Sequence, residues 1–135
     1  LGGGLPIGAC LMGEKVQDTM GAGTHGSTFG GNPAVCAGAL NILSRIDGKL
    51  LADVKAKGEY IVKELSGAPG VKGISGKGLM IGIETEKSAG DVLAECMANG
   101  VLVLTAHGKV RLVPALNIPM ELIEKAVAVI KAACA

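Results

Sequence analysis

The chain has 135 residues, of which 49% are hydrophobic and only 19% are charged, and its formal net charge is +1. That balance, with no cluster of Lys or Arg, is unlike the basic stripe of a nucleic-acid-binding protein, and no stretch reaches the roughly 18 consecutive apolar residues that a membrane helix needs. The four cysteines are scattered without a CxxC pair, which argues against zinc and favours free, buried thiols in a reducing compartment. The expected location is therefore the cytoplasm.

The aliphatic fraction is large although the chain has one phenylalanine, one tyrosine and no tryptophan. Few charges beside many small aliphatic residues indicate surfaces that other protein covers, or equally a compact core rich in Ala, Val and Leu. The length allows one ordinary domain at most.

The first part of the chain contains the stretch with the clearest chemistry. Leu5 to Met12 is a short apolar run bounded by glycine, which predicts a buried strand. Residues 21–31 hold five glycines and are expected to form a loop. Within HGSTFGGNP (residues 25–33), glycine lets the backbone approach a ligand, and the Ser27 and Thr28 hydroxyls are able to donate to a phosphate or carboxylate. The alternative is a glycine-rich turn before a buried helix.

A helix is expected to start directly after this loop. Asn32 is a favoured N-cap and Pro33 suits the first helical position, so free N–H groups and the helix dipole predict attraction of anions there. The helix over residues 33–46 is apolar on nearly every side, which predicts burial all round. Asp47-Gly48 marks a break, and the predicted domain boundary divides residues 1–47 from residues 48–135.

The second part alternates helices with pairs of strands. Strands this close together cannot be parallel neighbours, so we expect a largely antiparallel sheet with helices on one face, an α+β layer. Ser88, with Asp91 three residues later, resembles a capping box that opens the middle helix. The last helix is expected to turn Leu122, Ile123, Ala126, Val129, Ile130 and Ala133 inward. The expected elements are helices over 49–65, 88–97 and 119–133 and strands over 71–75, 79–84, 101–104 and 109–113.

Arg111 is the residue of the second part with a specific functional interpretation. It lies on a predicted strand between Val110 and Leu112, and a guanidinium on a rigid strand binds a carboxylate through two parallel hydrogen bonds. The alternative is an arginine of an edge strand that faces water.

Four motifs carry a family resemblance. LGGGLPIGA at residues 1–9, HGSTFGGNP, GLMIGIE at residues 78–84 and RLVPAL at residues 111–116 resemble the class III aminotransferases of pyridoxal-phosphate fold type I, and most strongly their acetylornithine branch. The resemblance covers essentially the whole chain but only the C-terminal third of a complete enzyme. It implies a C-terminal small domain (48–135) preceded by a remnant of the large cofactor domain and its connecting helix (1–47).

The resemblance also implies roles for individual residues. Thr28 would contact the phosphate of a pyridoxal 5'-phosphate bound by the neighbouring subunit of a homodimer, and Ser27 would lie near the substrate. Arg111 would hold the carboxylate of the amino acid or 2-oxo acid substrate. The lysine that forms a Schiff base with the cofactor would lie just upstream of Leu1, so the chain would hold no catalytic residue and would be inactive alone.

The implied reaction transfers an amino group from N-acetylornithine to 2-oxoglutarate in arginine biosynthesis. Ornithine, 4-aminobutyrate and succinyldiaminopimelate aminotransferases share these motifs, so the amino donor stays open. A free-standing α+β module that binds an anion through Arg111 and the Ser27/Thr28 loop, and an oligomerisation domain, are the alternatives from other classes.

Overall fold

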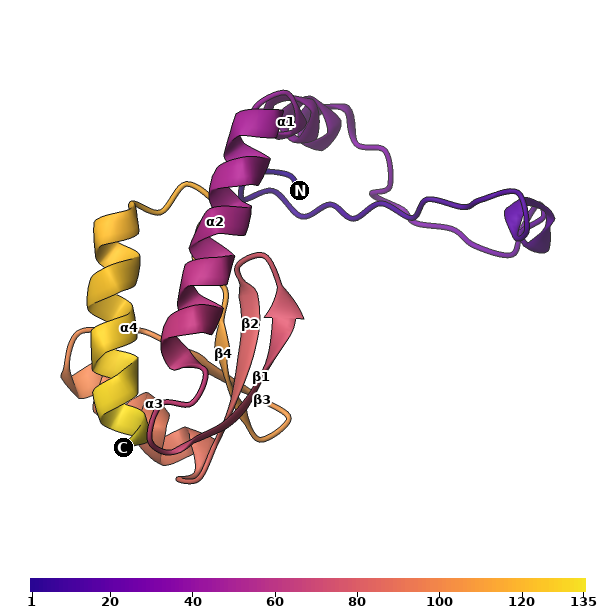
Figure 1. The fold of residues 1–135 in the computed structure, drawn as a ribbon. Helices are drawn as coiled ribbons and strands as arrows, with labels where there is room; N and C mark the ends of the chain where they lie inside the picture. The colour runs from indigo at the N-terminus through magenta and orange to yellow at the C-terminus, as the bar shows by residue number, and fades with distance from the viewer. The chain divides into compact units, whose positions relative to one another are not determined.

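Two units make up the structure, a computed structural model that describes residues 1–135 (Figure 1). The first unit is Leu1–Asp47 and the second is Gly48–Ala135. No helix of the chain combines the length and the hydropathy that a membrane crossing requires.

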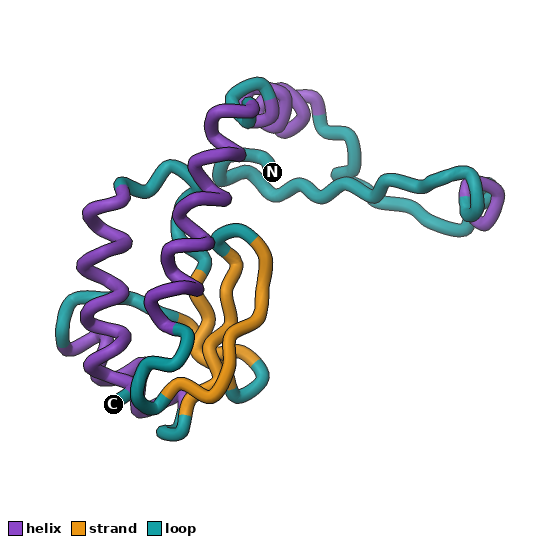
Figure 2. Tube along the Cα trace, in the orientation of Figure 1, coloured by secondary structure: helices purple, strands orange, loops and turns teal.

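The second unit is an antiparallel sheet with helices on one face. Its four strands lie in the order β1-β2-β4-β3, and every neighbouring pair is antiparallel. Figure 2 shows the helices gathered on one side of the strands, while the other face of the sheet carries no helix. The predicted α+β architecture is therefore confirmed. Its elements are α2 (Gly48–Leu65), β1 (Val71–Lys77), β2 (Met80–Thr85), α3 (Ala89–Ala98), β3 (Leu104–Ala106), β4 (Lys109–Leu112) and α4 (Met120–Cys134).

One hydrophobic core lies between this sheet and its helices. In β2 the side chains alternate, so that Ile81 and Ile83 are buried while Met80 on the other face is exposed. From the helices, Ile61, Leu65, Val92, Cys96, Ile123, Val127 and Ile130 join the same core.

The inward face of α4 differs from the predicted one. Leu122 is 45% exposed, whereas Ile123, Val127, Ile130 and Cys134 are buried at the helical spacing of three and four residues. The prediction that Leu122 faces inward is therefore wrong. Because α4 has several adjacent apolar residues, more than one of its faces could be buried. Packing against α2 and α3 determines which face of α4 points into the core.

Two glycines hold α2 against the β1–β2 turn. A Cβ at Gly58 would lie 2.4 Å from the carbonyl oxygen of Gly78, so helix and turn meet backbone to backbone. Gly76 and Gly78 have φ values of 136° and 57°, which this turn requires and which other residues rarely adopt. The predicted hairpin is confirmed, but its predicted Gly-Lys-Gly loop is wrong, because Gly76 and Lys77 belong to β1 and the turn consists of Gly78 and Leu79.

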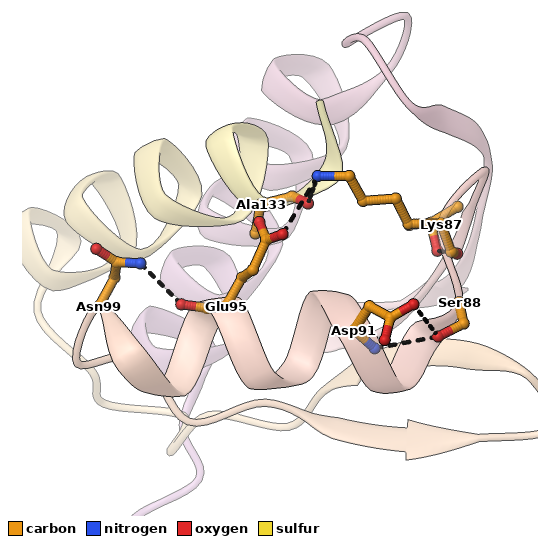
Figure 3. A network of polar contacts seen from close by, with 7 residues as sticks. Lys87, Ser88, Asp91, Glu95, Asn99 and Ala133 are labelled. Atoms are coloured by element: carbon orange, nitrogen blue, oxygen red, sulfur yellow. Dashed lines mark hydrogen bonds and ion pairs between the residues drawn. The ribbon is translucent and has the colours of Figure 1, made fainter.

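Polar contacts tie the start of α3 to the end of α4 (Figure 3). Ser88 caps α3, because its Oγ accepts from the Asp91 N–H at 3.1 Å and donates to the Asp91 carboxylate at 2.7 Å. The predicted cap is confirmed. Lys87 Nζ donates to the carbonyl of Ala133 at 3.1 Å and lies 3.4 Å from the Glu95 carboxylate, so it satisfies a C-terminal carbonyl of α4.

The first unit has one α-helix and little buried apolar surface. α1 (Pro33–Leu43) begins at the predicted residue, and a long excursion before it carries the 3₁₀ turn η1 (Gln17–Thr19) at its far end (Figure 1). The predicted strand over Leu5–Met12 is wrong, since this run pairs with no strand and Leu11 is 98% exposed. An apolar run becomes a buried strand only where a sheet receives it, and this unit has none.

The predicted burial of α1 on all sides is also wrong for this chain. Ala39 is its one buried residue, and Leu40 is 68% exposed. Of the cysteines, all free, Cys96 and Cys134 are buried as predicted, but Cys10 is exposed.

Candidate functional site

Arg111 lies on the face of the sheet that carries no helix. In β4 its neighbour Val110 is fully buried in the core, so the alternation along a strand places Arg111 on the opposite face, where it is exposed. Arg111 is paired with Gly82 of β2 on one side and with Leu104 of β3 on the other. Arg111 therefore stands on an inner strand, which contradicts the alternative of an edge-strand arginine.

The guanidinium of Arg111 has no acidic partner within the chain, since none of the ion pairs involves it. Lys109, two residues earlier on the same face, does have partners. Its Nζ lies 3.7 Å from the Glu84 carboxylate and 3.4 Å from Ser75 Oγ. An unpaired guanidinium on a strand held from both sides is preorganised for a carboxylate from outside the chain.

An apolar groove of about 530 Å³ in the second unit is lined mainly by α4, the 99–104 segment and residues 111–114, so Arg111 is among its lining residues. Its lining is mostly aliphatic, with Lys125 as the second cation. Arg111 thus borders apolar surface.

Ser27 and Thr28 lie in an exposed turn of the first unit, closed by the Gly30 N–H, which donates to the Ser27 carbonyl at 3.2 Å. Their hydroxyls make no hydrogen bond within the chain. By contrast, the hydroxyls of Thr19 and Thr24 donate to carbonyls of their own turns at 2.6 and 2.8 Å. Two adjacent hydroxyls therefore remain available to an anionic ligand.

The start of α1 offers such a ligand no free N–H. The Asn32 side chain accepts from the N–H groups of Ala34 and Val35 at 3.1 and 3.2 Å, and Pro33 has no N–H. The predicted N-cap is confirmed, but the prediction that free N–H groups of this helix attract an anion is wrong, because the cap itself takes them. The donors that remain are the hydroxyls and amides of the preceding loop.

The candidate residues are thus divided between the units. Ser27 and Thr28 belong to the first unit and Arg111 to the second. The contacts given above for each residue are therefore contacts within its own unit. Sequence reasoning missed Gly82 and Leu104, which flank Arg111. The signal for Gly82 lay in GLMIGIE, where a glycine interrupts an otherwise apolar strand.

The fold and these residues define a class of protein. Residues 1–134 match the family described as aminotransferase class-III, so the chain belongs to the class III aminotransferases.

Individual relatives carry more specific names. The chain is 46% identical to the acetylornithine aminotransferase of Haemophilus ducreyi over 132 residues, which are 96% of this chain and 34% of that protein. It is 39% identical to the acetylornithine aminotransferase of Aquifex aeolicus over 132 residues, covering 97% of this chain and 35% of the relative. The chain therefore spans about a third of the length of the curated relatives that it matches.

Solved structures show the same fold. The ornithine aminotransferase of Toxoplasma gondii superimposes with a TM-score of 0.73 at 34% identity, over 88% of this chain and 31% of that one, and holds PLP at partial occupancy in its active site. The acetylornithine aminotransferase of Elizabethkingia anophelis gives a TM-score of 0.70 at 29% identity, over 89% and 33% of the two chains.

Proposed function

We propose that this chain is the C-terminal portion of a pyridoxal-phosphate-dependent acetylornithine aminotransferase of the cytoplasm. The enzyme transfers an amino group from N-acetylornithine to 2-oxoglutarate in arginine biosynthesis. The observation that carries the proposal is the unpaired guanidinium of Arg111 on an inner strand, in a chain that belongs to the class III aminotransferases. The names of relatives at 39% and 46% identity support acetylornithine as the amino donor.

Arg111 binds the carboxylate of the amino acid or the 2-oxo acid. In 2-oxoglutarate a carboxylate stands beside the carbonyl carbon that reacts, so a fixed guanidinium orients this substrate. N-acetylornithine also carries a carboxylate, but its free amino group is on the δ carbon, away from that carboxylate. A hydrogen bond to a charged group contributes about 1.5–3 kcal/mol, which corresponds to roughly 10- to 150-fold in binding.

The Ser27/Thr28 loop fits the phosphate of the cofactor, because both hydroxyls are exposed and without partners. Thr28 donates to the phosphate of pyridoxal phosphate held by the neighbouring subunit of a homodimer, and Ser27 lies near the substrate. When bound, pyridoxal phosphate supplies the electron sink for removal of the amino group. The lysine that binds the cofactor precedes Leu1, so the 135-residue chain alone is inactive.

The exposed apolar surface of the first unit supports this assignment. Phe29 in the loop is 83% exposed and Leu40 in α1 is 68% exposed, and neither finds a layer to pack on within residues 1–47. We propose that residues 1–47 belong to the larger cofactor domain, and that the rest of the enzyme and the second subunit cover these exposed side chains. Residues 48–135 then form the small domain.

The test is steady-state kinetics of the aminotransferase that contains this chain, with N-acetylornithine and 2-oxoglutarate. Arg111→Gln is expected to raise the KM for 2-oxoglutarate roughly 10- to 150-fold. Lys109→Gln is the matched control, because it removes a cation of the same strand and face that already has partners within the chain. Equal KM values for wild type and Arg111→Gln, or turnover by the 135-residue chain alone, would contradict the proposal.

An ornithine aminotransferase is the second candidate, favoured by the TM-score of 0.73 with the Toxoplasma gondii enzyme. The same assay separates the two. A kcat/KM for ornithine above that for N-acetylornithine would replace the proposed donor while leaving the role of Arg111 intact.

A further inference from the structure

Gly82 occupies the position directly opposite Arg111. It is paired with Arg111 of β4 on one side and with Ser75 of β1 on the other. Its neighbours Ile81 and Ile83 are buried under the helices, so position 82 is on the face without a helix. Side chains of directly opposed residues have Cβ atoms only about 4.5–5.5 Å apart. A side chain at position 82 would therefore stand beside the base of the Arg111 side chain.

The fold does not require a glycine there. The φ of Gly82 is not in the left-handed region, and the nearest atoms to an added Cβ would be Ser75 Oγ at 3.4 Å and Lys109 Cδ at 3.6 Å. Both distances are ordinary contacts with side chains. Gly58 and Gly76 differ from Gly82 in this respect, because an added Cβ would lie 2.4 Å and 2.1 Å, respectively, from a backbone oxygen.

A glycine inside a strand also lowers stability, because it loses more backbone entropy on folding and packs no side chain. No backbone contact calls for the glycine, so the missing side chain has its effect on the surface above the strand, where the stem of Lys109 passes towards Ser75. That surface also carries Arg111, which is in register with Gly82 and has no ion-pair partner within the chain.

We propose that Gly82 is a specificity-determining position of the carboxylate site. Its missing side chain leaves open the space beside Arg111 that the substrate carboxylate and its neighbouring carbon occupy. This inference rests on the proposed function, in which Arg111 holds that carboxylate. A side chain at position 82 narrows the site without weakening the fold.

The test compares Gly82→Ala, Gly82→Val and Arg111→Gln in the aminotransferase, with the KM for 2-oxoglutarate, kcat and thermal midpoint measured for each. Gly82→Val is expected to raise the KM roughly 10- to 200-fold, the range for added methyl groups in a tight site, and Gly82→Ala less. The thermal midpoint should stay level or rise, because valine is favoured in strands. A purely structural role would move the midpoint down and the KM little.

Gly73→Val is the matched control, since Gly73 lies on the same face, is opposed to Glu84 rather than Arg111, and has open space around a Cβ. An unchanged KM in Gly82→Val together with a raised KM in Arg111→Gln would overturn this inference alone. An unchanged KM in Arg111→Gln would instead overturn the proposed function. A Lys109→Met variant that reproduces the effect of Gly82→Val would also overturn the inference, because displacement of Lys109 would then explain it.

Discussion

Replacing Gly70 with alanine should destabilise the second unit clearly more than the same change at Gly67. Both glycines follow α2 and have nearly equal φ values of 75° and 74°. Alanine in this conformation costs about 1–2 kcal/mol at either position. The surroundings differ: an added Cβ at Gly70 would lie 1.8 Å from the carbonyl oxygen of Cys134, while nothing lies within 4 Å at Gly67.

The additional cost at Gly70 comes from moving the end of α4. Ile130, Ala133 and Cys134 are buried there, so this end cannot shift without loosening the core. Forced overpacking of this kind typically costs about 1–3 kcal/mol, which gives about 2–5 kcal/mol for Gly70→Ala in total. A domain is usually stable by only about 5–15 kcal/mol.

Urea unfolding of the 135-residue chain, followed by far-UV circular dichroism, measures this difference directly. Gly67→Ala is the control, because it places alanine at the same positive φ but brings no Cβ against another residue. Free energies of unfolding that agree within about 0.5 kcal/mol for the two variants would refute the packing of Gly70 against α4.

Two further predictions concern titrating groups. The hydrogen bond from Lys131 at 2.7 Å lowers the pKa of Glu64, so its contribution to stability is present above the ordinary pKa of roughly 4.3 and is lost as the pH falls below it. Lys131→Gln should raise that pKa towards the ordinary value, which an NMR titration of the Glu64 carboxyl carbon measures; an unchanged pKa would show that Lys131 is not the cause. Burial raises the pKa of the Cys96 and Cys134 thiols, so a thiol reagent at pH 8 should modify Cys10 quickly and these two only in denaturant. Mass spectrometry of the modified peptides distinguishes the sites, and equal rates in the native chain would contradict the burial.

Local signals in the sequence predicted much of the second unit. The cap at Ser88 and the glycine turn between β1 and β2 depend on residues within a few positions of one another, so their effect is visible without the tertiary structure. Which apolar residues are buried depends on neighbours that are distant in the chain. For that reason Leu122 was predicted inside and Val127 was not singled out, and the run from Leu5 to Met12 was predicted as a strand.

The same distinction applies to the candidate site. Arg111 was found from the sequence because its strand and its neighbours are local, but Gly82 was not. Their register depends on the sheet order β1-β2-β4-β3, in which β4 rather than β3 pairs with β2 across an intervening helix. The spacing of the strands along the sequence does not predict that order. The structure was therefore needed to identify Gly82 as the neighbour of Arg111 on β2.

The two units prepare their polar groups for a ligand to different degrees. Arg111 stands between two hydrogen-bonded strands over a closed core, so the residues that fix its position all lie within the second unit. Ser27 and Thr28 stand in a turn with one backbone hydrogen bond, in a unit whose helix buries only Ala39. The position of Arg111 in the proposed carboxylate site is therefore set within the second unit, whereas the hydroxyl loop has little within residues 1–47 to hold it. The proposed homodimer, in which a second subunit receives that loop, would supply such protein, whereas an independent anion-binding module of 135 residues would have to hold the loop without it.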